Sequence, residues 1–265
     1  MAEQPNVPVA TTFEGKGVIS DHIPNALGVV GFIKHDYENF AFDEADLIIS
    51  VGFSIQQFDP KKINPNDDKT IIHINTFIKD TDAHHSTALN IIGDIDQTLE
   101  ALITRLQVKG IRFNESHPLI HELLNSEFRS YASDDSFPMK PQRIVYDTRR
   151  AMVDDDITLV DTGALKMWMA RLYPTYYSNT CVIDNSLSTM AWTLPGAVAA
   201  SLENPGQPVL AVMGDGSFLM SVQEIETAVR VGARMGGAGV GRQGLWPDQM
   251  EDEHSQWLVR GCRFR

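Results

Sequence analysis

The 265-residue sequence has few cysteines, a deficit of positive charge and no long apolar run. Its two cysteines, Cys181 and Cys262, are too few for a disulfide framework or a cysteine-based zinc site, and they fit a reducing compartment. There are 22 Lys and Arg against 35 Asp and Glu, giving a formal net charge of -13. Nucleic-acid binding needs cations that neutralise phosphates, so we expect no nucleic-acid partner.

The chain also lacks the segments that carry proteins into or across membranes. No stretch approaches the roughly 18 consecutive apolar residues of a membrane-spanning helix. The first residues, Met1 to Asn6, show no basic region followed by an apolar one, as a secretory signal would. We therefore expect a cytoplasmic protein with no membrane partner, and its 43% hydrophobic content is enough for a packed core.

Short apolar segments alternate with stretches that can be helical, a pattern typical of parallel strands joined by crossover helices. The sequence therefore predicts an α/β fold with two partial parallel-sheet units, a Rossmann-like one at 1–108 and a second at 141–235. In the first we expect strands at 7–11, 46–51, 70–74 and 88–92, and a helix at 95–108 capped by Asp94. In the second we expect helices at 141–152, 164–172, 194–202 and 222–231, and strands at 157–161, 180–183 and 209–213.

Two segments fall outside these units. Residues 109–140 contain charged residues, Pro118 and a turn-rich stretch ending at Pro138, and are predicted to be an interdomain linker with a short helix near 119–128. From Gly236 onward the sequence is rich in glycine and then mixed, with neither a strand nor a helix period. We expect an irregular C-terminal tail over 236–265.

The glycines Gly239, Gly241 and Gly244 have the spacing of a dinucleotide-binding turn. That turn needs a strand before it and a helix after it, because the pyrophosphate binds at the start of that helix. Here a helix is expected before the glycines, and Pro247 follows them within a stretch that has no helical period. The sequence therefore argues against a dinucleotide site at this place.

The stretch Gly214-Asp215-Gly216-Ser217 follows an expected strand and precedes an expected helix. It brings one carboxylate and several backbone N–H groups to the same point, which suits a divalent cation together with a diphosphate. A plain strand-to-helix turn, with Asp215 as the cap, explains the four residues equally well.

Longer stretches resemble a known family. Gly214 to Phe218, followed by Gln223 to Val229, resembles the metal and diphosphate signature of thiamine diphosphate-dependent enzymes. Two further stretches resemble the acetolactate synthase branch of that family, residues 161–171 and 188–198. The first half is similar to the central domain of that branch at 11–18, 45–52, 71–75 and 93–95.

The resemblance implies thiamine diphosphate and Mg²⁺ as cofactors, without FAD. It implies decarboxylation and carboligation of 2-oxoacids such as pyruvate, as in branched-chain amino-acid biosynthesis. For an intact relative it implies a homo-oligomer. Asp215 would ligate Mg²⁺, and Met190 would support the bent cofactor. The remaining implied cofactor contacts are Gly163 and Ala164 at the phosphate pocket, the Ser188 carbonyl at the aminopyrimidine, and Gly214, Gly216 and Ser217 at the diphosphate.

The chain departs from the family pattern at several points. Leu165 stands where the branch has a phosphate-contacting histidine, and Ser188 where it has a glycine. No stretch resembles the pyrimidine-binding domain, so we expect a central domain truncated at its N-terminus and a cofactor domain truncated at its C-terminus. We expect a fragment without activity. The alternatives are a non-catalytic remnant that binds a diphosphate or a relative, another 2-oxoacid decarboxylase or oxidase of the family, or a nucleotide-binding protein of another class.

Other candidates have simpler explanations. The adjacent His84 and His85 are expected in a solvated loop rather than at a metal. Residues 154–156 are expected to form a polar turn and residues 167–169 to pack a helix. Cys181 is expected to be a small buried residue.

Arg242 stands 27 positions beyond Asp215, where the family has a second metal ligand. A cation cannot ligate Mg²⁺. A shift of one base after the codon for Met235 allows codons for an apolar strand, an acidic residue at 242 and a family-like Tyr-Gly-Leu-Ile-Lys-Trp run. Our hypothesis is that residues 236–265 are translated out of frame.

This hypothesis predicts a run of G around codon 235 that permits the shifted frame. Reading the nucleotide sequence there tests it directly. A codon series that does not permit that frame contradicts the hypothesis.

Overall fold

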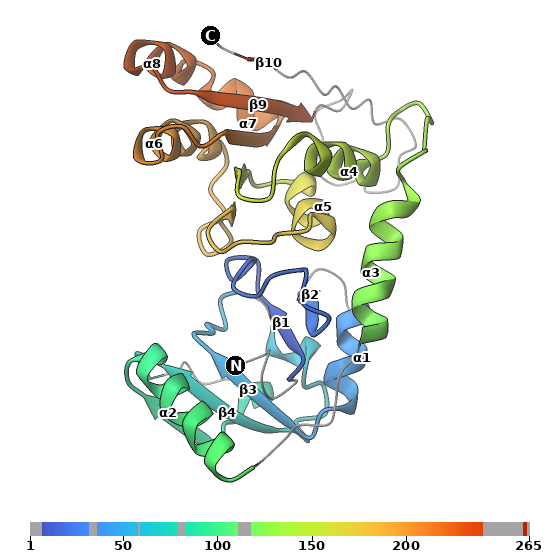
Figure 1. Ribbon diagram of the computed structural model, residues 1–265, viewed down its shortest axis with the longest axis vertical. Helices are drawn as coiled ribbons and strands as arrows, with labels where there is room; N and C mark the ends of the chain where they lie inside the picture. The colour runs from blue at the N-terminus through green and yellow to red at the C-terminus, as the bar shows by residue number, and fades with distance from the viewer. Residues whose placement is uncertain are drawn as a thin grey trace. The chain divides into compact units, whose positions relative to one another are not determined.

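The computed structural model describes residues 7–31, 36–57, 59–78, 83–110, 118–240 and 262–263. The chain divides into two compact units, whose elements are labelled in Figure 1. Unit 1 comprises Met1–Phe13 and His22–Leu123, and unit 2 comprises Glu14–Asp21 and Leu124–Arg265. The short segment 14–21 therefore belongs to unit 2, although the residues on both sides of it belong to unit 1.

Unit 1 contains two parallel sheets. One has β1 (Val9–Thr11) beside β2 (Ala26–Val29), and the other has the order β3 (Leu47–Val51), β4 (Thr70–Asn75), β5 (Leu89–Ile92). The helices are α1 (Tyr37–Glu44) and α2 (Ile95–Val108), with short 3-10 turns η1 (Pro60–Lys62) and η2 (Ala83–His85). The Asp94 side chain caps α2 by accepting from Gln97 N at 2.9 Å, as the sequence predicts.

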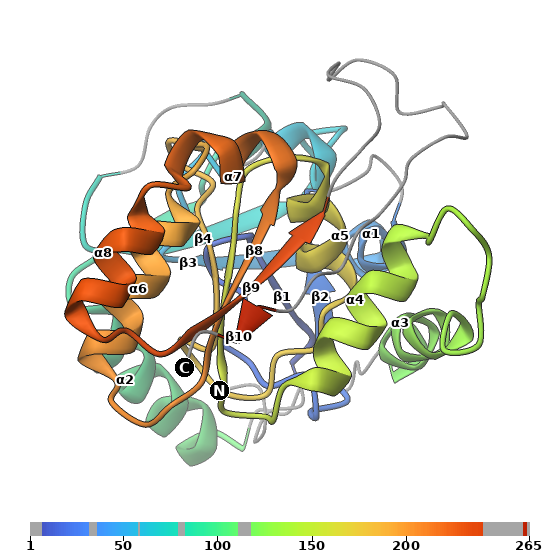
Figure 2. The ribbon, with the colours of Figure 1, turned by 90° about the horizontal axis from the view of Figure 1, so that it is seen from above.

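Unit 2 is built on one sheet of order β10-β9-β8-β6-β7. Its parallel strands are β6 (Ile157–Val160), β7 (Cys181–Ile183), β8 (Val209–Gly214) and β9 (Met235–Val240), and β10 (Cys262–Arg263) runs antiparallel to β9. The helices are α3 (Pro118–Ser130, which begins in unit 1), α4 (Pro141–Ala151), α5 (Ala164–Leu172), α6 (Thr193–Glu203), α7 (Asp215–Ser221) and α8 (Glu224–Val231). Figure 2 shows α6 and α8 on one side of β8 and β9, and α4 and α5 on the other.

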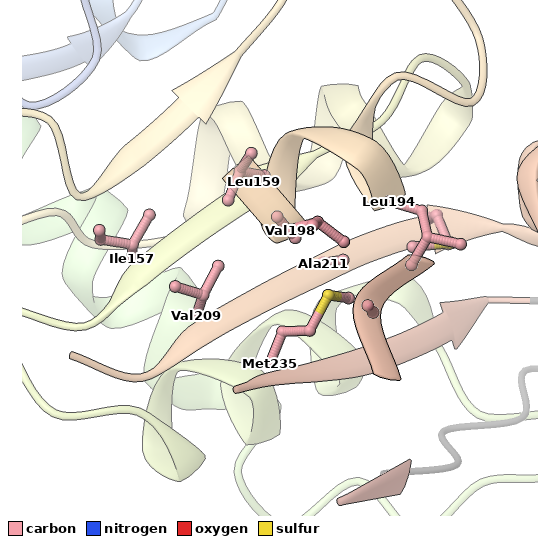
Figure 3. Close-up of a cluster of buried hydrophobic side chains, with 10 residues drawn as sticks. Ile157, Leu159, Leu194, Val198, Val209, Ala211 and Met235 are labelled. Carbon is pink, nitrogen blue, oxygen red and sulfur yellow. The ribbon is translucent and has the colours of Figure 1, made fainter. Parts of the chain in front are cut away.

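The core of unit 2 lies between this sheet and α6 (Figure 3). All four residues of β6 are buried, so both faces of the strand are covered. The one polar side chain of the strand, Thr158, has its buried hydroxyl 3.0 Å from the Tyr173 hydroxyl, within hydrogen-bond distance. The cluster consists of Ile157, Leu159, Leu194, Ala197, Val198, Val209, Ala211, Met213, Ala228 and Met235.

The structure confirms the α/β class and the two parallel-sheet units, and it corrects several details. The tail predicted to be irregular from Gly236 is a strand as far as Val240, because backbone N–H and C=O groups pair with β8 whatever the side-chain pattern. The helix predicted at 222–231 is confirmed as α8, which begins two residues later, at Glu224, and a separate short helix, α7, precedes it. Gly241, Arg242 and Gly244 lie outside the described residues.

Unit 1 contains a buried polar cluster that contradicts one expectation. His85 is fully buried, and its ring packs edge-on against Phe53 and His73, with ring centroids 5.2 and 5.6 Å apart. His73 in turn contacts the Ser50 hydroxyl through Nδ1 at 2.9 Å. The prediction of a solvated loop is wrong for His85, because aromatic packing covers its ring.

Cys181 in unit 2 is buried as predicted.

Among the residues that the structure describes, no helix is both long and apolar enough to cross a membrane.

The segment 14–21 is fastened to unit 2 at Thr175. Asp21 N donates to the Thr175 carbonyl at 2.9 Å, and Thr175 N donates to the Asp21 carboxylate at 2.7 Å. Gly17 of this segment is buried. Its φ of 89° lies in the left-handed region that favours glycine. A Cβ on Gly17 would lie 2.9 Å from Thr175 Cγ2 and 3.1 Å from the Tyr177 carbonyl. The backbone of this segment therefore packs closely against unit 2.

Replacing Gly17 with Ala is expected to destabilise unit 2 by about 3 kcal/mol, because backbone strain adds to the steric conflict. Gly206→Ala is the matched control, since Gly206 has a φ of 95° and nothing within 4 Å of its Cβ position. The control isolates the backbone strain of about 1 kcal/mol. Urea unfolding of the full chain measures both, and equal losses would contradict the close packing of the segment.

Candidate functional site

The residues that the sequence singled out follow three neighbouring strands of unit 2. β6 pairs in parallel with β7 and with β8, so the carboxyl ends of all three strands lie at one edge of the sheet. The loops leaving that edge are 161–163, 184–190 and 214–217. In open α/β sheets this edge is where ligands bind.

Asp161, at the end of β6, joins two of the connecting segments. Its side chain is fully buried. Oδ1 accepts from the backbone N–H of Thr162 at 2.7 Å and of Ala191 at 3.0 Å. Oδ2 accepts from Thr193 N at 3.4 Å. One carboxylate therefore holds the turn after β6 against the start of α6.

Gly163 and Ala164 form the start of α5. Gly163 is the N-cap, with a φ of 145° and no atom within 4 Å of the position of a Cβ. It supplies no side-chain cap to the helix. The first N–H groups of a helix carry partial positive charge and are a ready site for an anion. An anion such as a phosphate fits this place.

Residues 214–217 form the turn from β8 into α7. Gly214 ends the strand, and Asp215 is exposed, with Oδ1 accepting from Gly216 N at 2.8 Å. Ser217 is buried at the same turn. A Cβ on Gly216 would lie 3.9 Å from Cε of Met190, so Met190 reaches this turn from the loop after β7. Met190 is 46% exposed, leaving its side chain available to a ligand.

The loop after β7 has an unusual backbone. Ser188 and Ala191 have φ values of 48° and 68°, although neither is glycine. Such residues persist only where the surroundings determine the conformation. The Ser188 hydroxyl donates to the Asn185 carbonyl at 3.1 Å. Ser188, which was singled out for its carbonyl, therefore also closes its own loop.

Lys166 contacts the loop after β7, and no sequence pattern identified it. It lies in the first turn of α5, is 7% exposed, and directs its ammonium group toward the loop after β7. Burial lowers the pKa of Lys166, while the nearby carboxylates of Asp184 and Glu14 act in the opposite direction. In the sequence, Lys166 stands between the apolar residues Leu165 and Met167. Residue types alone do not distinguish a buried lysine in such a place from an exposed one.

The few metal-ligating side chains at this edge of the sheet suit a metal ion that is bound together with the phosphates of a ligand. Within the described part of the chain, no cluster of three or more His, Cys, Asp or Glu could hold a metal. Mg²⁺ bound with phosphates needs only one or two protein carboxylates, and the carboxylate of Asp215 is exposed at this edge. Among the described residues, Thr162 Oγ1, Thr193 Oγ1 and Trp192 Nε1 are buried polar atoms without a hydrogen-bond partner, and all three flank the Asp161 contacts. A polar ligand at this edge is consistent with them.

Family models match both halves of the chain. Residues 1–102 match the model described as thiamine pyrophosphate enzyme, central domain. Residues 161–235 match the model described as thiamine pyrophosphate enzyme, C-terminal TPP binding domain. The second match contains all three loops of the site.

Curated relatives agree with these matches. The chain is 34% identical over 236 residues to an acetolactate synthase of Bacillus subtilis (strain 168), covering 86% of this chain and 40% of that relative. It is 32% identical over 232 residues to a catabolic acetolactate synthase of Raoultella terrigena, covering 83% of this chain and 40% of the relative. It is 28% identical over 232 residues to acetolactate synthase isozyme 1 large subunit of Escherichia coli (strain K12), covering 86% and 40%. The chain thus spans about two fifths of the length of these relatives.

Replacing Asp161 with Asn is expected to destabilise unit 2 by about 2 kcal/mol, because an amide NH₂ would face backbone N–H groups that now donate to a carboxylate. The control is Asp155→Asn, at an exposed carboxylate in the turn before β6. Its effect should stay within about 0.5 kcal/mol. If chemical denaturation shows the two variants to be equally stable, Asp161 does not hold the site together.

Proposed function

Because the chain belongs to the thiamine pyrophosphate enzyme family, we propose that unit 2 binds thiamine diphosphate with Mg²⁺ as part of an acetolactate synthase-like enzyme that acts on a 2-oxoacid such as pyruvate. The observation that carries the proposal is the convergence of three loops at one sheet edge, two of them joined through Asp161. FAD is not part of the proposal. A homo-oligomer is the assembly expected for an intact relative.

Each proposed contact follows from the local backbone. The first turn of α5, at Gly163 and Ala164, would bind one end of the diphosphate through its N–H groups. Gly214, Gly216 and Ser217 would approach the other end, because glycine lets the backbone come close to a phosphate. Asp215 would place one oxygen on Mg²⁺. The proximity of Met190 to Gly216 supports a role for its side chain beneath the bound ring.

When bound, thiamine diphosphate would supply a nucleophilic carbon for a 2-oxoacid carbonyl and a sink for the electrons released on decarboxylation. The residues of this chain hold and orient the group. Met190 would fix the bend of the cofactor, and the Ser188 carbonyl would accept a hydrogen bond from its amino group.

A second candidate, a chain that binds the cofactor without turnover, is favoured by two residues. Leu165 is 7% exposed and apolar, so it offers no hydrogen bond to a phosphate. At position 242, where the family pattern has a second metal ligand, the sequence has an arginine, a residue type that cannot ligate Mg²⁺. We propose that the isolated chain retains the cofactor site of an acetolactate synthase-like enzyme and does not itself consume pyruvate.

The full chain is expected to bind thiamine diphosphate in the presence of Mg²⁺, measured by isothermal titration calorimetry. Asp215→Ala should weaken binding about tenfold, because it removes the carboxylate proposed to ligate the metal. Asp155→Ala is the control and should bind as the wild type does. Pyruvate should not be consumed. A wild-type chain without affinity contradicts the proposed site, and measurable turnover contradicts the proposed inactivity.

A further inference from the structure

The loop after β7 is held by two charged side chains that are remote from it in the sequence. Lys166 lies in the first turn of α5, and Glu14 lies in the segment 14–21 of unit 2. Both contact residues 184–188 of the loop. The same loop carries Ser188 and Met190, the two residues proposed to contact the ring system of the cofactor.

The contacts of Lys166 commit its ammonium group to this loop. Nζ donates to the Asp184 carbonyl at 3.3 Å, to Asn185 Oδ1 at 3.0 Å and to Ser188 Oγ at 3.1 Å. All three of these acceptors belong to the loop, and an ammonium group can donate to each of them. Since a charge is tolerated in a buried place only with such partners, the geometry favours a role in ordering the loop over direct contact with an anion.

Glu14 holds the same loop through its backbone. Glu14 Oε1 accepts from Ser186 N at 2.7 Å and from Asn185 N at 3.2 Å. Within the loop, Asp184 Oδ2 accepts from Thr189 N at 3.0 Å. Side chains from α5 and from the segment 14–21 therefore restrain the loop just before Met190.

These contacts explain the backbone conformation of Ser188. A non-glycine residue with a φ of 48° is disfavoured by about 1–2 kcal/mol relative to ordinary conformations. Ser188 adopts it while its hydroxyl bridges Lys166 Nζ and the Asn185 carbonyl. The Lys166 contact thus acts on the residue whose carbonyl is proposed to face the cofactor.

We propose that Lys166 is a positioning residue which, together with Glu14, fixes the loop Asp184–Met190 in its cofactor-receiving conformation before the cofactor binds. A loop ordered in advance strengthens binding, because the entropy of ordering is lost before the ligand arrives. The inference rests on the function proposed above for what the loop receives. The order of the loop is a property of the cofactor-free chain and can be measured without the cofactor.

Amide hydrogen exchange over 184–190 in the cofactor-free full chain tests this order. Lys166→Met keeps the length of the side chain and removes its donors, and it should speed exchange at Ser186 and Thr189 about tenfold. Glu14→Ala should speed exchange at Asn185 and Ser186 to a similar extent. Glu14→Gln keeps an accepting oxygen and should restore most of the protection. Lys61→Met, at an exposed lysine of unit 1, is the matched control and should change nothing.

Titration of the same variants with thiamine diphosphate and Mg²⁺ separates positioning from direct binding. Faster loop exchange together with about tenfold weaker binding in Lys166→Met supports the proposal. Weaker binding with unchanged loop exchange means that Lys166 contacts the anion itself, and overturns it. Unchanged exchange in both Lys166→Met and Glu14→Ala also overturns it. If the wild type does not bind at all, the proposed function fails, while faster exchange in the variants still supports positioning of the loop by Lys166.

Discussion

The candidate site depends on the buried carboxylate of Asp161. Placed where β6 ends, it accepts hydrogen bonds from the turn that leads into α5 and from the segment that leads into α6. A carboxylate buried away from solvent is tolerated when backbone N–H groups take the place of its hydration. Those same N–H groups belong to two different connections, so satisfying one carboxylate also fixes the relative position of two parts of the site.

The sheet beneath Asp161 supplies the rigid base for these loops. β6 is buried on both faces and pairs with β7 and β8, so the three strand ends have little freedom to separate. The loop after β7 is stabilised differently, by charged groups from α5 and from the segment 14–21. That segment lies within the part of the chain matched by the central-domain model, yet it packs in unit 2. The boundary between the family models is therefore not the boundary between the packed units.

Features that depend on local patterns could be predicted from the sequence. The strand predicted at 70–74, observed at Thr70–Asn75, follows from its apolar residues, and the helix at 95–108 follows from apolar spacing and a capping aspartate. Features that depend on distant partners could not. Glu14 meets Asn185 and Ser186 across 171 and 172 positions, and no local pattern marks such a contact. His85 is buried because aromatic neighbours cover it. β9 forms because its backbone pairs with β8. The periodicity of side chains along the sequence reveals neither contact.

We propose that the three loops at the carboxyl edge of β6, β7 and β8 form a single ligand site. The most direct measurement is hydrogen exchange of the full chain with and without thiamine diphosphate and Mg²⁺. Added protection is expected at 161–165, 184–191 and 214–217, and none is expected in β3, β4 and β5 of unit 1. Binding that leaves these three loops unprotected, or that protects unit 1 instead, would contradict it.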